Sequence, residues 1–191
     1  MSKTTWRPGK MLYPLPAVMV SCKKKGEEER PNIITVAWAG TVCSDPPMLS
    51  ISVRPSRYSH DIIEESGEFV VNLVTEKLVS ACDFCGVRSG RDFDKFAGLG
   101  LHPYVSDLLE TPAIEESPVN LYCSVVKTER LGSHDMYIAE IKGVTVDESY
   151  LDKNGRFDLE STGLIAYSHG EYFSLGEKLG SFGYSVRKKK K

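Results

Sequence analysis

The chain has 191 residues, of which 41% are hydrophobic and 26% are charged, and its formal net charge is −2. These values are typical of one globular domain with a hydrophobic core, and they exclude a disordered or fibrous chain. The near-neutral charge gives no general attraction to nucleic acid, and we interpret the basic run at residues 187–191 as a solvated tail without an assigned function. We therefore predict a single domain over residues 1–191.

Targeting signals and the use of cysteine indicate the cellular compartment of a protein. No run reaches the roughly 18 apolar residues that a membrane helix needs, and prolines interrupt the N-terminal segment, so neither a membrane span nor a signal peptide is predicted. The five cysteines are an odd number in dissimilar contexts, which argues against a disulfide framework. We expect a cytoplasmic protein that binds neither membrane nor nucleic acid.

The first part of the chain contains short runs typical of strands. Strands are predicted at residues 17–22, 32–39, 48–53 and 68–74, with a hairpin tip at 23–30 and a turn at Ala39 and Gly40. In the run 48–53, leucine, isoleucine and valine alternate with two serines, so one face of this strand is expected to be buried. A short helix is predicted at 59–66, with Ile62 and Ile63 facing inward.

The rest of the chain contains a polar helical stretch and three further predicted strands. Residues 76–96 have a helical and polar pattern, and the glycine-bearing stretch 85–96 is expected to be an ordered loop. Residues 119–127 and 136–146 are predicted to form an antiparallel pair, and 164–175 a last strand. Short, closely spaced strands with few helices predict a mainly β fold, a closed or partly closed antiparallel barrel of Greek-key type.

The polar segment that follows the strand at 48–53 has the composition of a phosphate site. It contains Arg54, Ser56, Arg57, Tyr58 and Ser59. Hydroxyls, backbone amides and guanidinium groups satisfy the oxygens of a phosphate ester. Upstream, the small residues Ala37, Ala39 and Gly40 would let the backbone approach a flat ring, with Trp38 as an aromatic wall. From spacing alone, an ordinary strand followed by a polar turn remains open as an alternative.

Four blocks of sequence together resemble a known family. They are NIITVAWAG, SDPPMLSISVRPSRYSHDII, EFVVNL and CGVRSGRDFDKF. Their order and spacing resemble the flavoredoxin branch of the flavin reductase-like family, over roughly residues 13–175. The resemblance implies an FMN-binding split barrel that forms a homodimer, with FMN in a groove between the subunits.

The resemblance also implies which residues hold the cofactor. The isoalloxazine and ribityl groups would be lined by Asn32, Thr35, Ala37, Trp38, Ala39 and Gly40. The ribityl and phosphate groups would be gripped by Arg54, Ser56, Tyr58 and Ser59. A second loop would add Ser89, Gly90, Asp94 and Lys95, with Lys95 as a cationic contact to the flavin or its phosphate.

Other candidate residues point to no separate chemistry. Cys82 and Cys85 form an isolated CxxC pair without the βαβ context of a thioredoxin motif or a second pair for zinc, so no metal site is predicted. His134 and His169 are lone histidines, of which His169 is the better candidate for a place near the flavin. No GxGxxG fingerprint for a dinucleotide is present.

Several functions fit this family resemblance. The first is an NAD(P)H-dependent oxidoreductase in which hydride passes to bound FMN and no catalytic side chain is required. The second is a flavoredoxin-type electron carrier, with a redox protein as partner and no nicotinamide activity of its own. A binding module without flavin and a use like that of pyridoxal phosphate oxidase remain open, because fold alone does not decide function. We expect a homodimer because a groove between two subunits buries a flat cofactor better than the rim of one small barrel.

Overall fold

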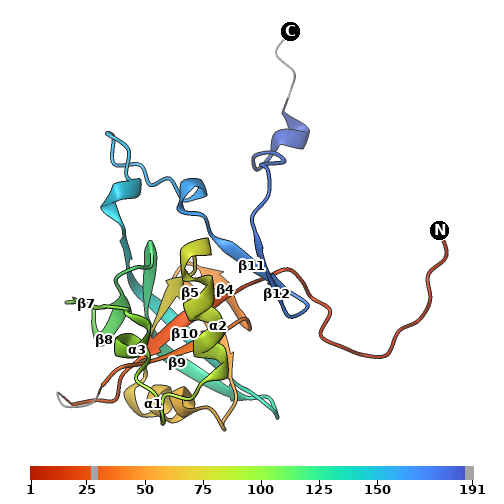
Figure 1. Cartoon of the computed structure of the whole chain (residues 1–191). Coiled ribbons are helices and arrows are strands. Elements are labelled where there is room, and N and C mark those ends of the chain that lie inside the picture. Colours follow the sequence, from red (N-terminus) through yellow and green to blue (C-terminus); the bar gives the residue numbers. More distant parts are fainter. Residues whose placement is uncertain (27–29, 188–191) are drawn as a thin grey trace.

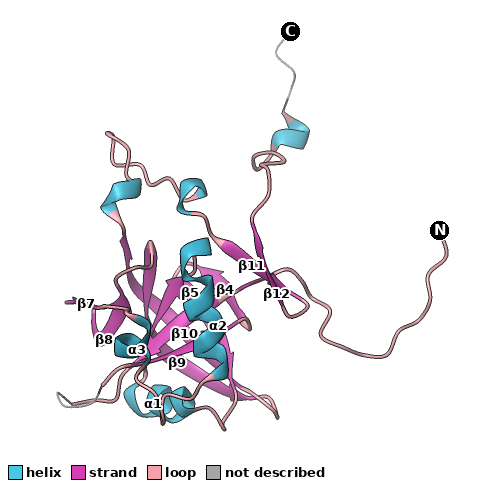
Figure 2. Cartoon of the chain, in the orientation of Figure 1, coloured by secondary structure: helices cyan, strands magenta, loops and turns pink. Residues whose placement is uncertain are grey.

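A computed structural model describes residues 1–26 and 30–187 of the chain. The body is a strongly curled antiparallel sheet of seven strands, with helices on its outer side (Figures 1 and 2). The strand order is β3-β2-β6-β9-β10-β5-β4. The bounds of these strands are β2 Val18–Cys22, β3 Asn32–Val36, β4 Ala39–Ser44, β5 Pro47–Val53, β6 Glu68–Leu73, β9 Val119–Arg130 and β10 Asp135–Val146. The predicted mainly β architecture is confirmed.

The predicted strand at 32–39 is two strands, and this part of the prediction is wrong. β3 ends at Val36 and β4 begins at Ala39, so the turn lies at Ala37 and Trp38. The backbone N–H of Ser52 donates to the Trp38 carbonyl over 2.9 Å, which fixes this bend. Gly40, expected in the turn, pairs instead with Ser50 in the ladder. The chain thereby passes from one edge strand of the curled sheet directly to the other, which brings the two edges together.

Alternating side chains divide the body into two apolar layers. In β2, Val18 and Val20 face the inside of the curled sheet, whereas Met19 faces outward. The predicted alternation in β5 is confirmed, since its aliphatic side chains are buried and its serines are half-buried. Helix α1 (Tyr58–Ser66) closes one end of the barrel with Ile62 and Ile63, as expected.

The outer face of β2 and β3 is covered by a second layer. It contains α2 (Val79–Val87), which follows the 3-10 turn η1 (Glu76–Leu78), and α3 (Lys95–Leu99). The hairpin of β7 (Pro103–Ser106) and β8 (Leu109–Ile114) lies beside them. The buried amide of Asn72 joins these parts, because its Nδ2 donates to the Met19 carbonyl and its Oδ1 accepts from the N–H of Ile114. A buried, satisfied amide therefore holds β8 against β2 and β6 of the barrel.

The C-terminal part of the body differs from the single last strand predicted at 164–175. It is a hairpin of β11 (Ile165–Ser168) and β12 (Glu171–Ser174), and β1 (Leu15–Pro16) adds a third strand. His169 and Gly170 turn the chain with φ values of 50° and 90°. Left-handed backbone at both turn residues matches the natural twist of a two-residue hairpin.

The connections and the ends of the chain complete the structure. Short 3-10 turns are η2 (Glu148–Tyr150), η3 (Glu160–Thr162) and η4 (Tyr184–Val186). Both terminal segments leave the body near β11 and β12 and extend away from it (Figure 1). Within the described residues, no helix has the length and apolar character needed to cross a membrane. Residues 27–29 of the predicted hairpin tip and 188–191 of the basic tail lie outside the described residues.

Candidate functional site

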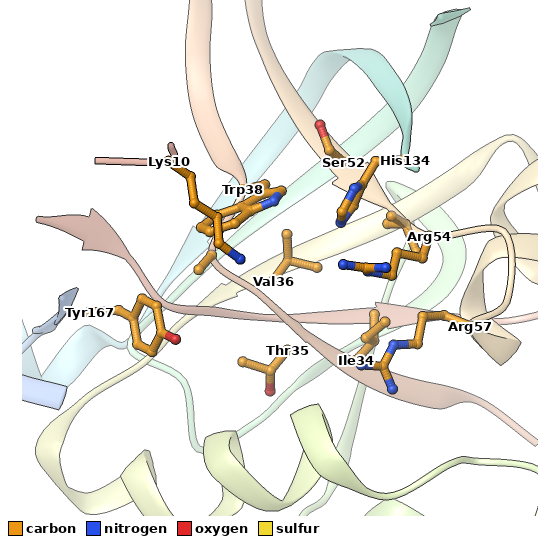
Figure 3. A pocket seen from close by; sticks show the side chains of 12 residues that line it. Lys10, Ile34, Thr35, Val36, Trp38, Ser52, Arg54, Arg57, His134 and Tyr167 are labelled. Carbon is orange, nitrogen blue, oxygen red and sulfur yellow. The ribbon is translucent and has the colours of Figure 1, made fainter. Parts of the chain in front are cut away.

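A groove of about 280 Å³ opens where the two edges of the curled sheet meet. Its apolar floor is formed by Ile34 and Val36 of β3, and Trp38 in the bend forms a side wall (Figure 3). Tyr167 of β11 stands at the far end. A flat apolar floor beside an indole ring is suited to a planar aromatic ligand.

Positive groups surround this groove. Lys10, Arg54 and Arg57 line it together with the imidazole of His134 (Figure 3). The Lys10 ammonium lies 5.4 Å from the centroid of the Trp38 ring, a cation–π contact. Burial lowers the pKa of His134, and the charges of Arg54 and Lys10 lower it further. A groove with this lining attracts an anionic ligand even though the whole chain is slightly negative.

A second, smaller pocket of about 120 Å³ adjoins the groove, and the two share Ile34 and Arg57. Hydroxyls reach it from Ser56, Tyr58, Ser59 and Ser89, and positive charges from Arg57, Arg88, Arg91 and Lys95. Of the described residues that line this pocket, none is acidic. Hydroxyl donors around several guanidinium groups form the donor set that a phosphate monoester requires. We call this pocket the anion cradle.

The loop after α2 approaches β3 very closely at the cradle. Asn32 is buried, and its Nδ2 donates to the Oγ of Ser59 over 2.8 Å, which orients that hydroxyl. A Cβ at Gly90 would lie 1.9 Å from Oδ1 of Asn32, so only glycine fits. The Arg30 guanidinium donates to the Gly90 carbonyl over 3.1 Å and holds the loop from outside.

Lys95 lies deeper than a surface ligand contact. The residue is 3% exposed, and its ammonium donates to the carbonyls of Ile33 and of Cys85, the latter over 2.9 Å. Burial lowers the pKa of Lys95. Since an ammonium group has three protons, one remains for a ligand in the cradle. Lys95 thus joins β3 to the end of α2 as well as lining the pocket.

The structure brings most of the predicted site residues together. The groove includes Thr35, Ala37, Trp38 and Arg54. The cradle includes Asn32, Ser56, Tyr58, Ser59, Ser89, Gly90 and Lys95. Ala39 and Gly40 line a neighbouring apolar groove together with Ala37 and Trp38. Asp94 is apart from these pockets, because its carboxylate caps α3 by accepting from the N–H of Ala97 over 3.1 Å.

Other lining residues were not among those predicted to hold the cofactor. Arg57 was named only as part of the polar segment at residues 54–59, whereas Arg88 and Arg91 were not singled out. All three lie inside the sequence blocks that carried the resemblance, so their charge was a usable signal. Lys10, Ser52, His134 and Tyr167 also line the groove. Most of these come from distant segments that only the curled sheet brings together. His134, rather than His169, is the histidine that lines it.

The CxxC pair lies in helix α2. Cys82 and Cys85 are both free and buried. Burial raises the pKa of Cys82 to about 12 and that of Cys85 to about 11, which keeps both thiols protonated at neutral pH. Across residues 1–26 and 30–187, no three histidine, cysteine or acidic side chains gather as a metal site would require.

The curled half-barrel, with the anion cradle beside the groove, defines a protein of the split-barrel class. Residues 10–176 match the flavin reductase like domain, and the chain belongs to this family.

Solved structures agree with this assignment. The chain is similar to flavoredoxin of Desulfovibrio vulgaris (Miyazaki F), with 30% identity, a TM-score of 0.88, and coverage of 97% of this chain and 100% of that one. Flavoredoxin from Methanosarcina acetivorans is 28% identical, with a TM-score of 0.87 and coverage of 98% and 100%. A protein of Shewanella frigidimarina described as a flavin reductase with a split barrel domain shares the fold at 23% identity, with a TM-score of 0.78 and coverage of 90% and 86%.

Proposed function

We propose that the protein is a homodimeric FMN-binding flavoprotein that acts as an NAD(P)H-dependent oxidoreductase. The observation that carries this proposal is the pairing of a flat groove beside Trp38 with an adjoining cradle of hydroxyls and guanidinium groups. The cradle suits a phosphate monoester and the groove suits a planar ring, and FMN joins these two chemical features in one molecule.

The residues of the chain would orient the cofactor and set its electrostatic environment. Ser59, fixed by Asn32, and Arg57 would hold the phosphate, and Ile34 and Trp38 would bound the ring. When bound, FMN supplies two-electron redox chemistry, so no nucleophile or general base is needed from the protein. Lys10 and Arg54 would favour negative charge in the groove.

The lining of the groove supports a nicotinamide donor. The groove is open to solvent and lined by positive groups, which suits a negatively charged nucleotide. NADH or NADPH would therefore dock against the exposed face of the flavin.

The second candidate function is a flavoredoxin-type electron carrier that receives electrons from a redox protein. It is favoured by the similarity to two flavoredoxins over nearly the whole chain. The same groove and cradle would serve this function, with a protein rather than a nucleotide as the electron donor.

A homodimer is proposed because one copy leaves the groove incomplete. In a single copy the groove is open to solvent rather than enclosed. A second copy related by a two-fold axis would cover the open groove and generate two equal sites.

The first test is an absorbance spectrum of the purified protein, followed by anaerobic addition of NADH and then NADPH. A yellow protein bleached by either nucleotide supports the oxidoreductase. A yellow protein that is reduced only when a redox protein donor is supplied supports the carrier. A colourless protein that takes up no added FMN contradicts both, and a monomer that still holds FMN in gel filtration contradicts the homodimer.

A variant of the cradle locates the phosphate. Because hydrogen bonds to charged groups contribute about 1.5–3 kcal/mol, Arg57→Ala should raise the Kd for FMN by roughly 10- to 150-fold. Riboflavin, which lacks the phosphate, should bind the variant and the wild type equally. Arg156→Ala, outside the groove and the cradle, serves as the control for loss of a surface charge. Equal loss of riboflavin and FMN binding would show that Arg57 does not contact the phosphate.

A further inference from the structure

The C-terminal segment beyond β12 carries apolar side chains that the body of the chain does not cover. We call residues 175–187 the C-terminal arm. Its exposed apolar residues are Leu175, Leu179, Phe182, Tyr184 and Val186. Leu179 is 93% exposed and Phe182 fully exposed. A tail that stays in solvent is ordinarily polar and charged, so this composition indicates a segment that packs against a surface.

The arm nevertheless has a defined local shape. At its base, the Lys178 ammonium forms an ion pair with Glu160. Near its end, the N–H of Tyr184 donates to the Ser181 carbonyl over 2.9 Å and begins the 3-10 turn η4. The Tyr184 ring lies against Gly180, where a Cβ would come within 2.6 Å of the ring. The arm extends away from the barrel (Figure 1), and its apolar side chains are exposed.

An apolar groove of about 540 Å³ lies beside the proposed flavin site and has room for such side chains. Its walls are the N-terminal segment, with Met11 and Leu12, and the bend and edge strand β4, with Trp38 and Val42. Met11, Leu12 and Val42 are themselves exposed in a single copy. The groove shares Lys10, Ala37 and Trp38 with the groove proposed to hold the flavin ring, so an occupant here would adjoin the cofactor.

We propose that the C-terminal arm of a second copy of this chain occupies this apolar groove, with Leu179 and Phe182 packed beside Trp38. This inference rests on the proposed FMN-binding homodimer and adds which segment of the partner completes the site. Thirteen residues span at most about 45 Å when fully extended, so the arm can reach well beyond the barrel that carries it. A two-fold axis would exchange the arms reciprocally, so each uncovered arm is matched with one uncovered groove.

A cross-linking experiment tests the placement directly. A photo-reactive phenylalanine analogue is introduced at position 182 of the full chain. Protein labelled with nitrogen-14 is mixed with protein labelled with nitrogen-15, and the mixture is irradiated after the dimers have exchanged subunits. We expect cross-links between peptides of different isotope content that join position 182 to residues 37–42 or 9–13. The same analogue at Leu131, an exposed residue in the turn between β9 and β10, is the control and should give none of these cross-links. Cross-links only within one copy, or none to the groove, would overturn the placement.

A variant of the arm tests its contribution to the site. The double substitution Leu179→Ser with Phe182→Ser should accelerate release of FMN at least tenfold and raise the dimer dissociation constant. Both side chains are exposed in a single copy, so the fold of the body should be retained, as checked by circular dichroism. Leu131→Ser is the matched control and should release FMN at the wild-type rate.

The outcomes separate this inference from the proposed function. A wild-type protein that binds no FMN or stays monomeric refutes the proposed function. A wild-type dimer that binds FMN, together with an arm variant that releases FMN and dissociates as the wild type does, refutes only the arm.

Discussion

Replacement of Gly90 by alanine is expected to weaken FMN binding without unfolding the protein. The new Cβ would lie 1.9 Å from Oδ1 and 2.5 Å from Cγ of Asn32, closer than atoms can approach. Either β3 or the loop at residues 88–94 must move. β3 is paired with β2 along its length, whereas the Gly90 carbonyl is held by the exposed Arg30 side chain. The loop should therefore move and open the cradle.

The size of the effect follows from the donors that the loop would withdraw from the cradle. The loop carries Arg88, Ser89 and Arg91, which line the cradle. A hydrogen bond to a charged group contributes about 1.5–3 kcal/mol. Loss of one such bond to the phosphate would raise the Kd for FMN by roughly 10- to 150-fold. The melting temperature of the apoprotein should change little, because the loop rather than the sheet yields.

The assay is a titration of apoprotein with FMN, followed by quenching of flavin fluorescence. Asn32→Ala removes the group that the Cβ would meet, so the double variant Asn32→Ala with Gly90→Ala should bind FMN no more weakly than Asn32→Ala alone. A wild-type Kd for Gly90→Ala, or simple additivity in the double variant, would refute the reasoning.

Two further predictions concern pH and thiol chemistry. A hydrogen bond from His60 holds the pKa of buried Asp135 below its usual value of 3.8, so the stabilisation it provides is present above that pH and is lost as the pH falls through the lowered pKa. Asp135→Asn should therefore reduce the free energy of unfolding by about 1–3 kcal/mol at neutral pH, and the gap between wild type and variant should shrink in acid. Urea titrations at several pH values measure both free energies of unfolding. A gap that grows in acid would contradict the assignment. Burial raises the pKa values of four thiols to about 11 or 12, so these thiols stay protonated and unreactive at about pH 8. In the folded protein, Ellman's reagent should therefore modify only the half-exposed Cys43 quickly, and the other four thiols should react once the protein is unfolded. The four thiols are those of Cys22, Cys82, Cys85 and Cys123. Rapid modification of two or more thiols in the folded protein would contradict their burial.

Elements whose pattern is local were predicted correctly. The alternation in β5, the inward pair Ile62 and Ile63 in α1, and the pairing of β9 with β10 all follow from the spacing of apolar residues. The strand predicted at 32–39 failed because an apolar run continues through the bend at Trp38. What ends β3 there is a long-range hydrogen bond from Ser52, which no local pattern reveals.

For the candidate site, most of the cradle could be predicted from the sequence, because its hydroxyls and Arg57 lie in two compact blocks of adjacent residues. The tertiary structure decided the rest. It placed Lys10, His134 and Tyr167 around one groove, although they lie far apart along the chain. It also directed Asp94 to the end of α3, since a carboxylate at that position satisfies a free N–H of the helix. The physical reason is that the chemistry of a side chain can be read from the residue itself. The sheet curls and brings its two edges together only through hydrogen bonds and packing between residues far apart in the chain.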